Sequence, residues 1–126
     1  MAGPGAIIPE SGGKFATTGA NRSANGSIWN IPEVAHTPTL NQANEWLRRG
    51  NAAAQTSTIQ ADADMYFPQG TVFTFEQSGA GQLTIVAAVG VTIRRAVGLK
   101  LAAQYAVAQV RKVADNEWVA FGALIA

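Results

Sequence analysis

The run TVFTFEQSGAGQLTIVAAVGVTIRR, residues 71–95, shows the pattern that decides the fold. Within it, three short segments alternate between the two faces of a strand and are rich in β-branched or aromatic residues: Thr71–Phe75, Gln82–Ala87 and Val91–Arg94. This period of two is typical of half-buried strands. The segments are separated by glycines, which suit tight hairpin turns because they lack a Cβ atom: Gly79, Gly81 and Gly90. Regular short strands joined by such turns predict a β-sandwich or barrel.

The remainder of the C-terminal stretch is less uniform. In Leu99–Val113 the alanine, leucine and glutamine content allows a helix, whereas the valines favour strands, and we expect strands. Asp115–Asn116 predicts a turn because both side chains hydrogen-bond to nearby backbone groups. Glu117–Phe121 then predicts a final strand, in which either Trp118 or Val119 faces inward.

Upstream of this core, residues 39–50 predict one short helix. Thr39 and Gln42 have the spacing of a capping box, and Gly50 is suited to end the helix. Gln55–Gln60 predicts a further strand. We find no self-similarity at a period of about 20–50 residues, which is typical of solenoids, so we do not expect a solenoid.

Residues 1–36 differ from residues 37–126 because they are rich in Gly, Ser, Asn, Pro and Ala. Such a segment buries too little apolar surface to order itself, so we expect an extended N-terminal arm over 1–36 and a compact β domain over 37–126. The arm has two apolar clusters that we expect to contact a partner: Ile7, Ile8, Ile28, Trp29 and Ile31. For the second cluster, packing on the chain's own β domain is equally open.

Composition limits the classes of function. The 126 residues suffice for one domain, and a hydrophobic content of 48% allows a real core. Only 13% of residues are charged, well below the roughly 25% usual for soluble domains, which favours burial of surface in an assembly. A net charge of +1 argues against nucleic-acid binding. The lack of cysteine excludes disulfides and thiolate metal sites, and no apolar run reaches the ~18 residues of a membrane span.

We find no group of residues typical of catalysis, cofactor binding or metal binding. His36 has no nucleophile motif beside it, which favours a structural or solvent-facing histidine. Asp62 and Asp64 lack the remaining ligands of a calcium loop. Glu76 and Glu117 are read as ordinary strand carboxylates rather than a glycosidase pair. We therefore expect no enzyme activity, no cofactor and no metal.

Three pairs of basic residues remain: Arg48–Arg49, Arg94–Arg95 and Arg111–Lys112. Neighbouring residues on a strand point to opposite faces, so one member of a pair can point toward an interface. We take Arg94 and Arg95 as candidate contacts with an acidic partner surface. The alternative is a solvated charge that protects a strand edge.

Many positions of the core also occur together in a known module. They include Phe67-Pro68-x-Gly70-Thr71, Gly79-Ala80-Gly81-Gln82, Leu99-Lys100-Leu101-Ala102 and Trp118-Val119-x-x-Gly122. Over residues 37–126 the chain resembles a small β domain of tailed-bacteriophage virion proteins. The resemblance implies a compact β-sandwich or jelly-roll-like domain without enzyme activity. Residues 94–98 depart from the module, which is usually smaller and more polar there, and this favours a specialised loop. Arg48–Arg49 is a second local feature of this chain.

The resemblance implies two structural roles. As a capsid cement or decoration protein, the chain would be made in the host cytoplasm and bind the major capsid protein at the virion surface, as a homotrimer with its N-terminal arm acting as a staple. As a tail-fibre or tail-spike accessory protein, it would bind a host receptor instead. The short chain and the arm favour the cement role, with no membrane or nucleic-acid partner.

Overall fold

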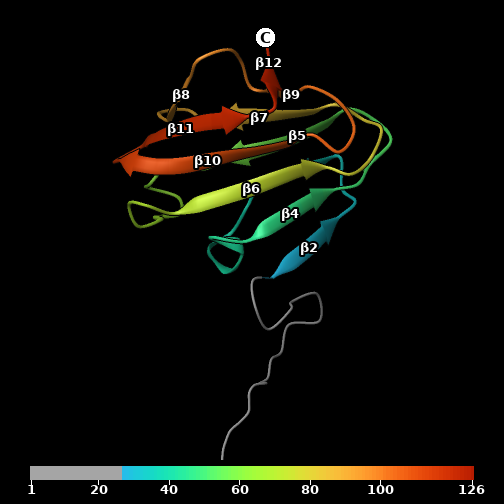
Figure 1. The fold of residues 1–126 in the computed structure, drawn as a ribbon. Coiled ribbons are helices and arrows are strands. Elements are labelled where there is room, and N and C mark those ends of the chain that lie inside the picture. The colour runs from blue at the N-terminus through green and yellow to red at the C-terminus, as the bar shows by residue number, and fades with distance from the viewer. Residues whose placement is uncertain (1–26) are drawn as a thin grey trace, which may run out of the picture.

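The computed structural model describes residues 27–126, so Ile7, Ile8 and the rest of the predicted arm up to residue 26 lie outside the described part (Figure 1). The described residues form two sheets and a 3-10 turn, η1 (Leu40–Gln42). One sheet has the strand order β2 (Ile28–Ile31), β4 (Trp46–Arg49), β6 (Val72–Gln77), β10 (Val107–Ala114), β11 (Glu117–Gly122), β8 (Thr92–Arg95). The other has the order β12 (Leu124–Ile125), β9 (Lys100–Leu101), β7 (Leu83–Ala87), β5 (Gln55–Ile59), β3 (Ala35–His36). A compact, mainly β fold with two sheets is therefore confirmed.

From β2 to β7 the chain winds as a coil. The strands β2, β4 and β6 lie in the six-stranded sheet and β3, β5 and β7 in the five-stranded sheet, so each step along the chain crosses between the sheets. The four strands from β2 to β5 each pair in parallel with the strand two places further on. This is the winding of a β-solenoid, so the predicted hairpins and jelly-roll-like connections are wrong here, as is our expectation of no solenoid.

The unequal length of the coil's turns explains that error. Ile31 pairs with Arg49, 18 residues later, whereas Arg48 pairs with Glu76, 28 residues later. A repeat of fixed length is therefore not available for a sequence comparison to detect. The glycines at the end of β6 form a corner between the two sheets, where sequence alone indicated a hairpin within one sheet.

After β7 the winding in parallel pairs stops, and β10 joins the six-stranded sheet in antiparallel pairs. β10 pairs antiparallel with β6, and β11 folds back antiparallel on β10 through the predicted turn at Asp115–Asn116, where Asn116 has a φ of 53°. β11 also pairs in parallel with β8, at the end of the sheet remote from β2. Within Leu99–Val113 the chain forms β9 and most of β10, separated by a turn at residues 102–106, so the predicted strands are confirmed outside that turn and no helix forms.

The predicted helix over residues 39–50 is wrong. Only η1 is helical there, and it keeps the spacing that suggested a cap, because the Gln42 side chain accepts a hydrogen bond from the Thr39 amide at 3.1 Å. Asn44 then turns the chain with a φ of 64°. Trp46–Arg49 is extended because it pairs with strands on both sides, β2 and β6, and this pairing outweighs a local helix preference.

The described β domain also begins before residue 37. β2 and β3 fall within the predicted arm of 1–36, yet β2 pairs with β4 and β3 pairs with β5. The pairing strands are far downstream, and sequence alone had no means of identifying them.

The core lies between the two sheets. Trp118 is completely buried and faces Phe73 at a ring distance of 5.7 Å and Phe67 at 5.8 Å. Phe73 and Phe75 face inward from β6 as their alternation predicts. The five-stranded sheet contributes buried aliphatic residues to the same cluster: Ile59, Leu83, Ile85 and Leu101.

Candidate functional site

The residues considered for chemistry do not come together. Asp62 pairs with Lys112, whereas Glu76 and Glu117 accept hydrogen bonds from arginines on the outer face of the six-stranded sheet. Within residues 27–126 no group of three or more His, Cys, Asp or Glu side chains is arranged to hold a metal ion. These carboxylates therefore have structural partners.

Lys112 explains the role of Asp62. Its side chain is buried, and its Nζ donates to Asp62 Oδ1 at 2.6 Å and to the Phe67 carbonyl at 2.7 Å. The other carboxylate oxygen of Asp62 accepts from the Asn116 amide at 3.1 Å. A buried ammonium needs such partners because burial without them is costly. The pair ties the loop before β6 to the β10–β11 turn.

The outer face of the six-stranded sheet presents a row of side chains across five strands. The paired positions are Ile28, Trp46, Thr74, Gln109 and Phe121. We call these five residues the transverse row. Its two ends are apolar and exposed: Ile28 is 47% exposed, Trp46 37% and Phe121 46%. Its centre is polar, because Gln109 Nε2 donates to Thr74 Oγ1 at 2.9 Å.

Hydrogen bonds hold the Trp46 ring against the sheet. Trp46 Nε1 donates to Glu76 Oε1 at 2.9 Å, and Arg48 Nε donates to the same oxygen at 2.8 Å. A tryptophan fixed in this way loses little side-chain entropy when a partner covers it, which makes it a suitable anchor.

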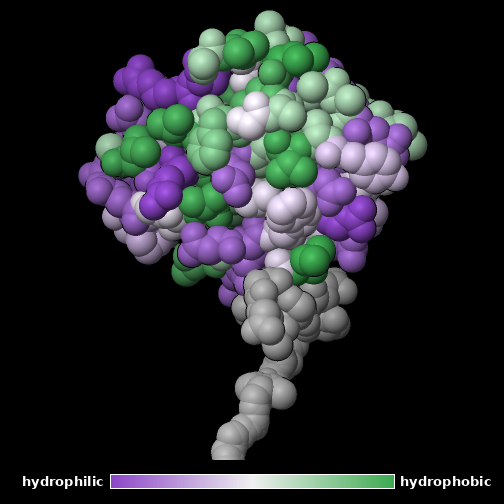
Figure 2. Space-filling model, viewed as in Figure 1, coloured by the Kyte–Doolittle hydropathy of each residue, from purple (hydrophilic) through white to green (hydrophobic). Residues whose placement is uncertain are grey.

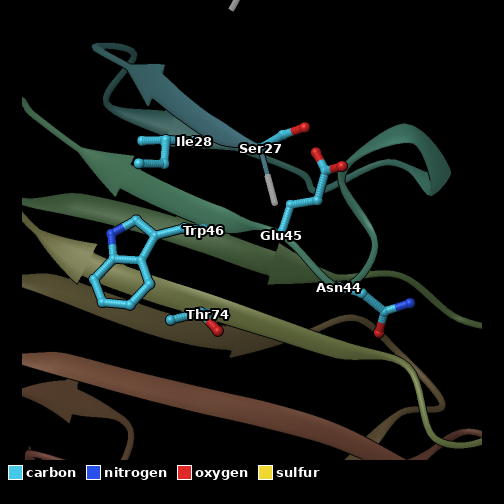
Figure 3. A pocket seen from close by; sticks show the side chains of 6 residues that line it. All are labelled: Ser27, Ile28, Asn44, Glu45, Trp46 and Thr74. Atoms are coloured by element: carbon cyan, nitrogen blue, oxygen red, sulfur yellow. The ribbon is translucent and has the colours of Figure 1, made fainter. Parts of the chain in front are cut away.

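A hollow lies beside Trp46 at the β2 end of this face. Its volume is about 290 Å³, and it is lined by Ser27, Ile28, Asn44, Glu45, Trp46 and Thr74. Figure 3 shows the Ile28, Trp46 and Thr74 side chains projecting from neighbouring strands over the sheet. The hollow is open and partly apolar, which suits a side chain of a partner better than an enclosed small ligand.

Hydropathy over the face seen in Figure 2 is mixed in the same way. In Figure 2, polar and apolar side chains are interspersed over the face in view, with more apolar residues toward the top, where Figure 1 places β12 and β9. An interspersed surface of this kind is typical of a non-obligate interface rather than of a permanent hydrophobic one.

The structure divides the predicted contact residues. Ile28 lies on the surface, whereas Ile31 is buried in the core and Trp29 packs partly against it, donating through Nε1 to Glu45. Arg94 is exposed and donates to Glu117 at 3.0 Å. Arg95 is exposed as well and donates to the Ile93 carbonyl at 3.1 Å.

Sequence reasoning missed two residues of this surface. Trp46 falls within the predicted helix, and Phe121 falls within a strand whose inward face the sequence leaves open. Trp118 points inward, and the alternation along β11 therefore places Phe121 outward. For Trp46 the useful signal was the alternating exposure of Trp46–Arg49, which only strand pairing reveals.

A second cluster of polar residues lies inside, where strands of the two sheets meet. Arg49 is completely buried, and its guanidinium donates to five acceptors: Ser57 Oγ and the carbonyls of Ile31, Glu33, Val34 and Thr56, at 2.8–3.2 Å. Burial lowers the pKa of Arg49, and the charge of Glu33 opposes that shift. The guanidinium thus fastens the corner between β2 and β3 to β5.

His36 lies next to this cluster and gives the fold a dependence on pH. Burial, and then the charge of Arg49, lower the pKa of His36 below its usual 6.5, with an opposing effect of Glu33. The Nδ1 atom is buried and has no hydrogen-bond partner within residues 27–126. The folded protein therefore favours neutral His36, and its contribution to stability is full above pH 6.5 and is lost as the pH falls through and below that value.

We expect the free energy of unfolding to fall between pH 7.5 and pH 5, and to fall less in His36→Gln. Urea unfolding followed by tryptophan fluorescence measures the free energy of unfolding of both proteins at both pH values. The carboxyl groups contribute equally to the pH dependence of the two proteins, so the difference between them reports on His36. An identical pH dependence in the variant would show that His36 does not titrate differently on folding.

Comparison with known proteins gives no assignment: no family model, curated protein or solved structure matches this chain. Among the described residues, no helix is long and apolar enough to cross a membrane.

Proposed function

We propose that the protein is a capsid cement or decoration protein of a tailed bacteriophage, which binds the major capsid protein at the virion surface and stabilises the shell. It acts by binding and not by catalysis. The proposal combines the resemblance of residues 37–126 to virion β domains with the exposed transverse row. The two facing sheets supply a rigid, sandwich-like body that presents this row.

The transverse row is the observation that supports the proposal most directly. It offers two separate aromatic anchors, Trp46 and Phe121, on one face of one sheet. Aromatic side chains dominate the binding energy of many interfaces. Around them, Arg48–Glu76 and Arg94–Glu117 are already paired, so the face presents satisfied charges. Charges that are already paired contribute more to the specificity of binding than to long-range attraction of a partner.

The low overall charge agrees with this role. With 13% charged residues and a net charge of +1, the chain has a weakly solvated surface that gains from burial. A protein that binds only the assembled shell stabilises that shell by mass action. In the proposal a homotrimer presents three copies of the face, and residues 1–26 reach a neighbouring capsid subunit.

Replacement of both aromatic anchors tests the proposed surface. We expect Trp46→Ala/Phe121→Ala to bind expanded capsid shells about tenfold or more weakly, because each truncation removes a potential hot spot. Co-sedimentation of the purified protein with shells measures the affinity, and circular dichroism checks the fold. Val89→Ala/Val97→Ala is the matched control, since it also shortens two exposed apolar side chains away from the row.

If both double variants bind shells as the unaltered protein does, this face is not the attachment surface. If the unaltered protein binds host cells and not shells, the tail-fibre role replaces the cement role.

A further inference from the structure

We propose that His36 and Arg49 form an acid-sensitive latch, which holds residues 32–37 on the coil at neutral pH and lets this corner open in acid while the core remains folded. The inference goes beyond the proposed function and does not depend on it. It also goes beyond a general loss of stability in acid, because it assigns the loss to the opening of one segment.

The corner between β2 and β3 has little apolar packing of its own. Ile31 at the end of β2 is buried, and so is Pro38 after β3. Between these two residues, 32–35 and Thr37 are exposed and His36 is half-buried. Segments with few buried apolar contacts open locally at a low cost in free energy. Opening of residues 32–37 would therefore sacrifice little hydrophobic burial.

Hydrogen bonds hold this corner in place of apolar packing. The buried guanidinium of Arg49 donates to the carbonyl of Glu33 at 2.8 Å and to that of Val34 at 3.2 Å. The amide of Thr56 in β5 donates to the same Val34 carbonyl at 2.8 Å. Closure of the corner thus depends strongly on one buried cation.

His36 belongs to the same corner and lies close to that cation. In the pairing of β3 with β5, His36 is opposite Ser57, whose hydroxyl accepts from Arg49 Nε at 2.9 Å. The charged groups that act on the imidazole are Arg49 of β4 and Glu33 of the corner itself. The residues of β5 that pair with β3, Thr56 and Ser57, carry no charge.

Protonation of His36 opposes the closed corner in two ways. It places a hydrogen on Nδ1, a buried atom with no acceptor within residues 27–126, and it adds a second positive charge beside Arg49. Burial, and then Arg49, lower the pKa of His36 below 6.5, and Glu33 opposes this effect. The closed corner therefore favours neutral imidazole.

The direction of the pH effect follows from this difference. In the open corner His36 is solvated and titrates near its ordinary pKa of about 6.5. The open form therefore binds a proton more readily than the closed form does. The closed corner has its full advantage above pH 6.5 and loses it as the pH falls through and below that value. At pH 5 the ratio of charged to neutral imidazole in the open form limits the increase in opening to about thirtyfold.

Hydrogen exchange of the full chain at pH 7.5 and pH 5, corrected for the intrinsic exchange rate, tests the latch. The Thr56 amide reports on the corner because its acceptor is the Val34 carbonyl, whereas the amides of β10 report on the core because β10 lies between β6 and β11. We expect protection of the Thr56 amide to fall about tenfold or more from pH 7.5 to pH 5, with a ceiling of about thirtyfold. In the matched variant His36→Gln, protection of the Thr56 amide should change little between the two pH values.

The dependence of exchange on urea separates a local opening from unfolding of the whole domain. At pH 5 we expect low concentrations of urea to leave exchange of the Thr56 amide unchanged and to accelerate exchange of the β10 amides, because a local opening exposes little surface. Equal sensitivity of both sets to urea would overturn the latch. An equal pH effect in His36→Gln, or unchanged protection of the Thr56 amide at pH 5, would overturn it as well.

The imidazole itself gives a second measurement, which needs no variant. His36 is the only histidine in the chain, so its ring protons give an unambiguous NMR signal. We expect this signal to titrate with a midpoint below pH 6.5, and the amide signals of residues 33–36 to shift over the same range. A midpoint at or above pH 6.5 would contradict the latch. These experiments use the protein without capsid, so their failure is distinguishable from failure of the attachment proposal.

Discussion

Arg49→Ala is expected to lower the free energy of unfolding by about 3–5 kcal/mol, because removal of a buried charged donor leaves its acceptors without partners. Five oxygens depend on this guanidinium, and four of them are backbone carbonyls of segments in two different turns of the coil. Water cannot easily replace it, since Arg49 is completely buried. Urea unfolding at pH 7.5, followed by circular dichroism, gives the free energy.

The neighbouring residue provides a matched control. Arg48 carries the same charge on the same strand, but its side chain is 39% exposed and its main partner is Glu76. We expect Arg48→Ala to cost less than about 1 kcal/mol, as partly exposed ion pairs usually do. Similar losses in the two variants would show that the interior hydrogen bonds of Arg49 do not stabilise the coil.

Gly81→Ala is expected to cost about 3 kcal/mol or more, because an added methyl group would collide with backbone that has no room to move. A Cβ atom at Gly81 would lie 1.8 Å from the Ala53 carbonyl oxygen. The same glycine is fixed in place by its amide, which donates to the Asn51 carbonyl at 3.1 Å. Here two corners of the coil stack backbone on backbone, and only glycine permits that approach.

Gly50 lies near the same corner and serves as the control. A Cβ atom there would meet the Ser78 hydroxyl oxygen at 3.4 Å, which is an ordinary contact. We expect Gly50→Ala to change stability by less than about 0.5 kcal/mol, since its effect on the unfolded chain is small and favourable. Thermal unfolding of both variants measures the contrast, and a tolerated Gly81→Ala would mean that the two corners separate readily.

The strands and glycines around Gly81 show which features the sequence predicts and which it does not. Alternation along Thr71–Phe75 and Gln82–Ala87 correctly predicts strands β6 and β7 and their inward residues. The function of the glycines between them is different from the one expected. Gly79 and Gly81 do not adopt positive φ, and they are needed because neighbouring backbone lies too close for a side chain. Such proximity arises from residues 51–53, which no local pattern connects to Gly81.

The candidate surface, too, was predictable from the sequence only in part. Ile28 is recognisable as an apolar residue in a polar segment, but its alignment with Trp46 and Phe121 depends on pairing between strands that are distant in sequence. Arg49 could be identified only as one of two adjacent basic residues, because its burial follows from the strand that replaced the predicted helix. Register across a sheet is a tertiary property, so it was not available from periodicity.

The position of Trp118 bears on how the chain folds during its synthesis. The rings that it contacts, Phe67 and Phe73, leave the ribosome many residues earlier, and strands such as β2 and β4 are complete before them. A nascent chain can therefore form the early parallel pairs, yet it lacks the indole that fills the centre of its interior until β11 is made. We expect tight side-chain packing to be acquired only then, with the unfinished coil dependent on protection from aggregation beforehand.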